Sequence, residues 1–205
     1  WFLLYRTKYG HQLHAVGQKR EAARLAGDLT ALNQSRKALT EKGKEEAIRI
    51  IETTELKNDR VLVVYLPDCH ESLAGIIAGR IREKYHRPAF VLTGGETSAK
   101  GSGRSIESYS MYEELVKCAD LMIQFGGHPM AAGLSIEEKN IEEFRRRLNV
   151  NCTLTDEELR PKIVIDVPMP VSYITKELVE QISLLEPFGK GNTKPLFAQK
   201  GLKVL

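Results

Sequence analysis

The sequence predicts an α/β fold in which helices flank a central mixed sheet. Residues 61–66 form a continuous apolar run rich in β-branched side chains, which is typical of a strand covered on both faces. An amphipathic segment over 72–85 predicts a helix, and a second apolar run follows at 89–92. Strand, helix and strand joined by short connections make a βαβ unit, which is right-handed in nearly all cases.

Length and composition set the broad class. A chain of 205 residues forms one or two domains, and its formal net charge of +3 permits nucleic-acid binding without requiring it. Cys69, Cys118 and Cys152 are widely spaced, so we expect unpaired thiols in a reducing compartment. The sequence shows no signal peptide and no apolar run long enough to cross a membrane. We therefore expect a cytoplasmic protein with no membrane partner.

The region before the βαβ unit is predicted to be helical. Residues 19–56 predict one or two helices, and Gly43 is a candidate for a bend between them. Further upstream, His11 and His14 would share one face of a helix and could hold a metal. No third ligand lies near them in the sequence, so solvated or packed histidines are the favoured interpretation.

The region after the βαβ unit predicts the rest of the same sheet. Strands are predicted at 99–106 and 131–136, and helices at 111–125 and 140–150. The three consecutive arginines that begin at Arg145 are interpreted as a solvated helix face.

A polar stretch over 151–162 predicts a domain boundary. Beyond it, a helix is predicted at 175–184 with Thr175 as its N-cap. Three short strands are also predicted, at 163–167, 196–198 and 202–205.

Two polar clusters set among glycines form the candidate functional site. The first is Gly101-Ser102-Gly103-Arg104-Ser105, and the second is Gly126-Gly127-His128. Glycine lets a backbone approach a ligand closely, and exposed amides in such a loop can form an anion-binding nest. Arg104 offers a planar fork suited to phosphate, and strand alternation places Ser102 on the same face. Taken alone, either cluster could equally be a solvated turn or a loop that carries a histidine.

Arg80 is a further candidate ligand. It borders the apolar stripe of the helix over 72–85. A charged side chain in that position often extends to solvent, and it could equally reach a phosphate across the helix.

Three motifs carry a resemblance to a known family. The second cluster, extended through Pro129-Met130-Ala131-Ala132-Gly133, resembles the signature of the DHHA1 domain, the substrate-binding half of DHH phosphoesterases. The first cluster resembles that domain's upstream Ser-x-Arg-Ser element. The segment Leu185-Glu186-Pro187-Phe188-Gly189, continued by Gly191-Asn192, resembles the opening of the OB domain of RecJ-type single-strand-specific exonucleases.

The resemblance implies three regions and a function. Residues 1–56 would be a helical connector from a catalytic domain missing from this chain, 57–150 a DHHA1 substrate-binding domain, and 151–205 the start of an OB-type β domain. The implied activity is that of a 5′→3′ single-stranded-DNA exonuclease of DNA repair and recombination, with single-stranded DNA as its partner. OB folds bind such strands through a basic groove and aromatic stacking.

The resemblance also implies roles for the candidate residues. His128 would be the catalytic residue, directed with the amides of Gly126 and Gly127 at a phosphate near the metals. The family uses Mn²⁺ or Mg²⁺ held partly by an Asp-His-His motif, and no such triplet occurs here, so the metal would bind outside this chain. Four side chains would bind substrate phosphates: Arg80, Ser102, Arg104 and Ser105.

One stretch departs from the family pattern, and two alternatives stay open. The family reads His-Pro-Gly-Val where this chain has His70-Glu71-Ser72-Leu73, although Gly75 and Arg80 match the residues that follow. The first alternative is an oligonucleotide or cyclic-dinucleotide phosphodiesterase of the same superfamily. The second is a nucleic-acid-binding module with no enzymatic partner domain. The Leu185–Asn192 segment argues against the first, and an Asp-His-His motif upstream would argue against the second.

Overall fold

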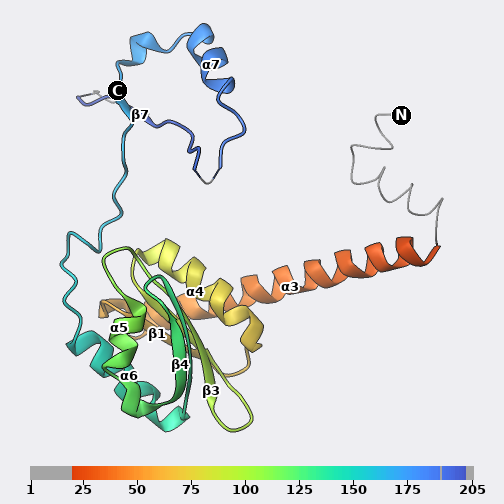
Figure 1. Cartoon of the computed structure of the whole chain (residues 1–205), viewed down its shortest axis with the longest axis vertical. Helices are drawn as coiled ribbons and strands as arrows, with labels where there is room; N and C mark the ends of the chain where they lie inside the picture. Colours follow the sequence, from red (N-terminus) through yellow and green to blue (C-terminus); the bar gives the residue numbers. More distant parts are fainter. Residues whose placement is uncertain (1–19, 190, 202–205) are drawn as a thin grey trace. The chain divides into compact units, whose positions relative to one another are not determined.

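The computed structural model describes residues 20–189 and 191–201, which divide between two compact units. The first unit ends at Arg160 and the second begins at Pro161, and each is described here by itself (Figure 1). His11, His14 and the strand predicted at 202–205 lie outside the described residues.

The first unit is built on a five-stranded mixed sheet with the strand order β1-β2-β3-β5-β4. β1 and β2 run parallel and are joined by helix α4, as the βαβ prediction requires, and the other neighbours are antiparallel. The predicted α/β class with a mixed sheet is therefore confirmed. The strands are β1 (Leu62–Leu66), β2 (Ala89–Thr93), β3 (Ala99–Arg104), β4 (Met122–His128) and β5 (Ala131–Ile136).

Helices cover the two faces of this sheet unequally. On one face, α3 (Arg20–Thr53) and α4 (Glu71–Tyr85) bury the side chains of β1 and β2 in an apolar core. On the other face, α5 (Met111–Val116) and α6 (Ile141–Val150) cover a second core to which all five strands contribute (Figure 1). Side chains of β1 pack in both cores, so both faces of the strand are apolar and its sequence does not alternate between apolar and polar residues.

The expected bend at Gly43 is absent, because α3 is one continuous helix of 34 residues. A Cβ atom at Gly43 would lie 2.6 Å from Cδ1 of Ile77, which is fully buried on α4. Glycine at this position therefore lets α3 and α4 approach each other closely. No described helix of the chain is long and apolar enough to cross a membrane.

The helix predicted at 111–125 is wrong in its second half. α5 ends at Val116, a 3-10 turn spans Ala119–Leu121, and β4 begins at Met122. A short apolar segment such as 122–125 fits a helix or a strand equally well by periodicity, and pairing with β5 decides between them. The Gly-Gly-His cluster consequently lies in an edge strand and not in a loop after a helix.

The second unit is small and has no fully buried residue among those described. It contains α7 (Lys176–Ser183) and two short parallel strands, β6 (Val167–Pro168) and β7 (Phe197–Ala198). Thr175 caps α7 by accepting a hydrogen bond from the amide of Leu178, as predicted. The strand predicted at 163–167 is shorter than expected, because Ile163 and Val164 are 74% and 73% exposed and pair with no strand.

Candidate functional site

Three neighbouring strands place their polar and small side chains on one open face of the sheet. β3 and β4 both pair with β5, and directly opposite residues of antiparallel strands point to the same face. The face is the one that α3 and α4 cover over β1 and β2. By standard strand spacings, it is about 10 Å wide and about 14 Å long. Its cross-strand rows are Lys100–Ser135–Gln124, Ser102–Gly133–Gly126 and Arg104–Ala131–His128.

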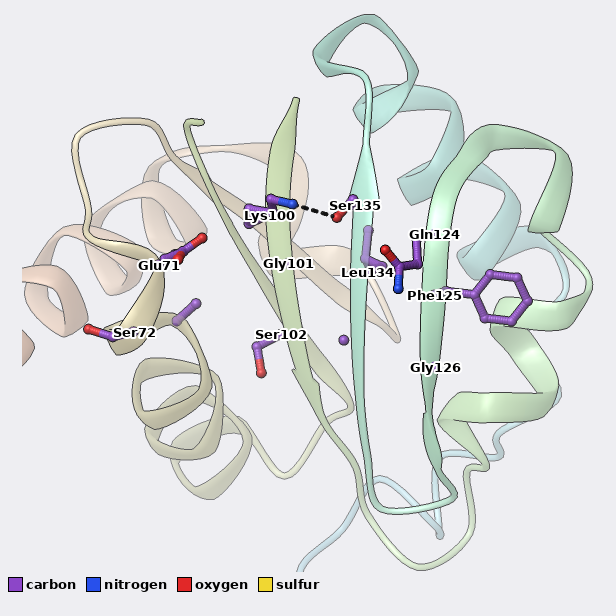
Figure 2. A pocket seen from close by; sticks show the side chains of 12 residues that line it. Glu71, Ser72, Lys100, Gly101, Ser102, Gln124, Phe125, Gly126, Leu134 and Ser135 are labelled. Atoms are coloured by element: carbon purple, nitrogen blue, oxygen red, sulfur yellow. Dashed lines mark hydrogen bonds between the residues drawn. The ribbon is translucent and has the colours of Figure 1, made fainter. Parts of the chain in front are cut away.

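A groove of about 520 Å³ occupies the first two of these rows. The first turn of α4 forms its wall through Glu71 and Ser72, and the three strands form its floor (Figure 2). Lys100 lies in the groove and donates a hydrogen bond to Oγ of Ser135 at 3.2 Å. Ser102 also lines the groove. The floor therefore offers a cation and several hydrogen-bonding groups beside bare backbone.

The two glycines of β4, Gly126 and Gly127, have different roles. A Cβ atom at Gly126 would meet nothing within 4 Å, so glycine there keeps the groove floor open without any demand from the fold. Gly127 has φ +150°, and a Cβ atom would lie 2.4 Å from the carbonyl oxygen of Ala131. Only glycine fits at Gly127, because a side chain there would strike the partner strand.

The glycines of β3 do not form the expected anion-binding nest. β3 is a regular strand between β2 and β5, so its amides are used by the two ladders. Gly101 and Gly103 face the core on the opposite side, where a Cβ atom would meet Leu134 at 3.0 Å or the sulfur of Met111 at 2.5 Å. They make room for core side chains. β4 is an edge strand, so amides on its outer side remain for a ligand.

Arg104 is half-buried where β3 passes beneath α4. Its Nη1 donates to Oγ of Ser102 at 3.1 Å and to the carbonyl of Gly103 at 2.7 Å. Within the described part of the chain, Nε and Nη2 make no hydrogen bond, so these donors are available to an anion. Arginine binds phosphate through such a pair of parallel donors.

His128 is exposed at the end of β4. Its Nδ1 accepts a hydrogen bond from the amide of Met130 at 3.3 Å, which assigns the proton of the neutral ring to Nε2. The ring thus presents an N–H donor. His128 and Arg104 lie on one face of the sheet, since both stand opposite Ala131. The groove lining includes Ser102 and Gly126 but stops short of this third row.

Ser105 lies apart from the other predicted ligands. It is 1% exposed, and its hydroxyl donates to the carbonyl of Tyr109 at 2.5 Å. Its amide donates to the carbonyl of Met130, so the residue holds the turn that carries His128. Burial, with Glu114 nearby, raises the pKa of the Tyr109 phenol above its usual range. The assignment of Ser105 as a phosphate ligand is therefore corrected, because its hydroxyl is buried and already bonded.

Arg80 also lies away from the groove. It follows Gly75 by five residues on α4, which is about 140° around a helix axis. Its guanidinium pairs with Glu83 at 3.1 Å and is well exposed. The structure does not bring Arg80 to Arg104 or to the groove lining.

Sequence reasoning did not select Lys100, Gln124 and Ser135, which line the groove. Alternation along the predicted strand puts Lys100 on the face of Ser102 and Arg104, so its place beside them follows from the sequence pattern. Gln124 and Ser135 carried no such signal. Gln124 lies in the segment predicted as helix. Ser135 lies in a predicted strand, but its neighbours on adjacent strands depend on a cross-strand register that the sequence does not show.

The described residues contain no group of three or more His, Cys, Asp or Glu side chains that could hold a metal ion. The groove has one carboxylate, Glu71, among its lining residues. These side chains do not fit the divalent metal site of the family, so no chemical step is assigned to a metal within this chain.

The fold and site define a domain class, and the comparisons agree with it. Residues 58–152 match the DHHA1 domain, and residues 165–205 match the RecJ OB domain. The chain therefore carries a DHHA1 domain followed by RecJ OB-domain sequence, and it is homologous to the RecJ exonucleases.

Curated relatives of this chain are named as RecJ exonucleases. The chain is 36% identical over 179 residues to the single-stranded-DNA-specific exonuclease RecJ of Bacillus subtilis, covering 85% of this chain and 23% of the relative. It is 36% identical over 187 residues to RecJ of Escherichia coli, covering 86% of this chain and 32% of the relative. The chain thus spans about a quarter to a third of the length of these curated relatives.

Solved structures give the same assignment. RecJ from Thermus thermophilus in complex with Mg²⁺ matches with a TM-score of 0.71 and 28% identity, over 95% of this chain and 29% of that chain. Exonuclease RecJ bound to manganese matches with a TM-score of 0.55 and 30% identity, over 63% of this chain and 32% of that chain.

Proposed function

We propose that this chain is the substrate-binding part of a 5′→3′ single-stranded-DNA-specific exonuclease of DNA repair and recombination. The observation that carries the proposal is the open sheet face on which Lys100, Arg104 and His128 surround a glycine floor. RecJ relatives named as single-stranded-DNA-specific exonucleases support it. In this proposal, residues 1–56 are the helical connector, 57–150 the DHHA1 domain and 151–205 the start of the OB domain.

Polar residues of the open sheet face have roles in this proposal. Lys100 and Arg104 neutralise phosphates, which supplies most of the affinity of a protein for a nucleic-acid backbone. Ser102 and the Nε2–H of His128 donate hydrogen bonds to phosphate oxygens, and the donor at His128 stabilises charge near the reacting phosphate. The bare backbone at Gly126 and Gly133 lets the strand lie close to the sheet. Arg80 and Ser105 have no place in this binding surface.

The proposed metal ions bind outside the residues that the structure describes. Solved RecJ structures contain Mg²⁺ or Mn²⁺, and such ions generate a hydroxide and stabilise the oxygens of a phosphodiester displacement. The residues of this chain would bind and orient the strand for that reaction.

A cytoplasmic location belongs to the same proposal, since the three cysteines are free in the described structure.

The salt dependence of binding tests the proposed groove. In the full-length protein, Lys100→Gln should weaken binding to single-stranded DNA and reduce the slope of log K against log salt by about 0.7, the value for one lost phosphate contact. Lys117→Gln is the matched control, because Lys117 is the C-cap residue of α5, which covers the opposite face of the sheet, and it pairs with Glu114. Fluorescence anisotropy at several salt concentrations measures both slopes. Equal slopes for the two variants would contradict the proposal.

A further inference from the structure

Helix α4 contains two glycines in its interior, Gly75 and Gly79. Glycine in the middle of a helix destabilises it relative to alanine, so each position needs a reason of its own. The two lie one turn apart and differ in what surrounds them. This difference shows which of them lies against the candidate site.

Gly75 lies against the predicted phosphate ligands. A Cβ atom at Gly75 would be 2.7 Å from Nη2 of Arg104 and 3.0 Å from Oγ of Ser102. A Cβ atom at Gly79 would meet nothing within 4 Å. The space beside Gly75 is therefore occupied by the end of the Arg104 side chain, and the space beside Gly79 is empty.

The guanidinium of Arg104 is held from two sides. Its Nη1 is fixed by hydrogen bonds to Ser102 and to the carbonyl of Gly103, and its Nη2 lies against the bare backbone of α4 at Gly75. A methyl group at Gly75 would be too close to Nη2 for any real contact. The atoms it meets are the ends of two side chains, so the guanidinium would move while the backbones of α4 and β3 stay in place.

We propose that Gly75 is a positioning residue for Arg104. Its missing side chain leaves room for the guanidinium between α4 and β3, and this keeps the remaining donors of Arg104 directed at the bound strand. Glycine at this position makes the helix less stable than alanine would, but it permits this placement of the guanidinium. The inference rests on the proposed function, in which Arg104 binds a substrate phosphate.

Two alanine variants of the full-length protein test this role. Gly75→Ala should weaken binding of 5′-phosphorylated single-stranded DNA at least about fivefold, approaching the loss expected for Arg104→Ala, because a charge-assisted contact is misdirected. Gly79→Ala should bind as the wild type does. Both variants should have a Tm equal to or above that of the wild type, because alanine favours helix. A purely structural role for Gly75 would not separate binding from Tm in this way.

A double-mutant cycle with Arg104→Ala shows whether the effect passes through Arg104. In the Arg104→Ala background, Gly75→Ala should cause no further loss of affinity. The proposal is overturned if Gly75→Ala binds normally while Arg104→Ala does not, if its loss is the same in both backgrounds, or if its Tm falls below that of the wild type. In the last case the methyl group would be displacing α4 itself.

The cycle also separates this inference from the proposed function. If Arg104→Ala itself binds normally, phosphate binding by Arg104 is wrong, and the crystal structure of Gly75→Ala then decides the positioning claim alone. A guanidinium that has left its place beside α4 supports the claim, and an unmoved guanidinium contradicts it.

Discussion

Arg104 is the side chain whose loss should weaken strand binding most. Arg104→Ala in the full-length protein should reduce affinity for a strand with a 5′-phosphate by about ten- to a hundredfold, because hydrogen bonds to charged groups are worth about 1.5–3 kcal/mol. Arg104→Lys should recover only part of this loss, since an ammonium keeps the charge but not the planar fork. Affinity and rate on strands with and without a 5′-phosphate are the measurements. Unchanged behaviour of Arg104→Ala on both strands would show that the residue does not bind the phosphate.

Ser102 and Ser105 should respond differently to substitution by alanine, one in strand binding and the other in stability. Ser105→Ala removes a buried donor from the carbonyl of Tyr109, so it should lower the free energy of unfolding by about 1–3 kcal/mol. Ser102→Ala removes a hydroxyl from the groove lining, so it should weaken strand binding and change stability little. Urea denaturation and anisotropy distinguish the two effects. A stable Ser105→Ala variant with weakened binding would return Ser105 to the list of ligands.

At the scale of elements, two adjacent glycines of the β4–β5 hairpin should have different effects: Gly127 on stability and Gly126 on strand binding. Gly127→Ala should lower stability by at least about 1–3 kcal/mol, because its positive φ and the contact with the carbonyl of Ala131 both exclude a side chain. Gly126→Ala should fold normally and bind single-stranded DNA more weakly, because its methyl group stands on the groove floor. Thermal unfolding and anisotropy of both variants are the measurements. Normal binding by Gly126→Ala would mean that the strand does not approach the sheet at this point.

The arginines of α6 form ion pairs and are not simply a solvated face. Arg145 binds Asp59 near the start of β1, with Nε to Oδ2 at 2.5 Å, and Arg147 binds Asp120 at 2.8 Å. Glu143 receives hydrogen bonds from Arg146 and Arg147, which lower the pKa of its carboxyl group to about 2. α6 is thereby connected to neighbouring segments through charged side chains.

The lowered pKa of Glu143 predicts a pH dependence of stability. A depressed pKa contributes stability that is fully present above the unfolded value of 4.5 and is lost as the pH falls to about 2. Glu143→Gln should therefore lower Tm at pH 7, and the difference from the wild type should shrink as the pH falls from 5 toward about 3. Glu142→Gln is the control, because its partner Arg145 keeps its contact with Asp59. A Tm difference that stays constant with pH would contradict the role of the carboxylate charge.

At the scale of the whole molecule, the strand-binding part and the metal chemistry should be separable. The sequence lacks an Asp-His-His triplet, and the described residues hold no metal-ligand cluster. The 205-residue chain should therefore leave labelled single-stranded DNA intact in the presence of Mn²⁺, whereas the full-length protein should degrade it. Metal-dependent degradation by the pure chain, removed by a chelator, would refute this prediction.

Much of the architecture was predictable because its signals are local. The apolar run of β1, the stripe of α4 and the cap of α7 at Thr175 each depend on neighbouring residues in the sequence. Alternation along β3 also predicted that Ser102 and Arg104 share a face. The segment at 122–125 was misassigned because its conformation depends on pairing with β5, and local periodicity carries no information about that partner.

The sequence by itself determined the βαβ unit, the two glycine clusters and the family to which they point. Only the tertiary structure decided how the clusters are used. It joined Lys100, Ser135 and Gln124 across three strands, turned Ser105 inward and placed Gly75 against Arg104. The physical reason is that alternation sets which side chains of one strand share a face. Which face is left open depends on cross-strand register and on where α3 and α4 pack, and both are contacts between residues far apart in the chain.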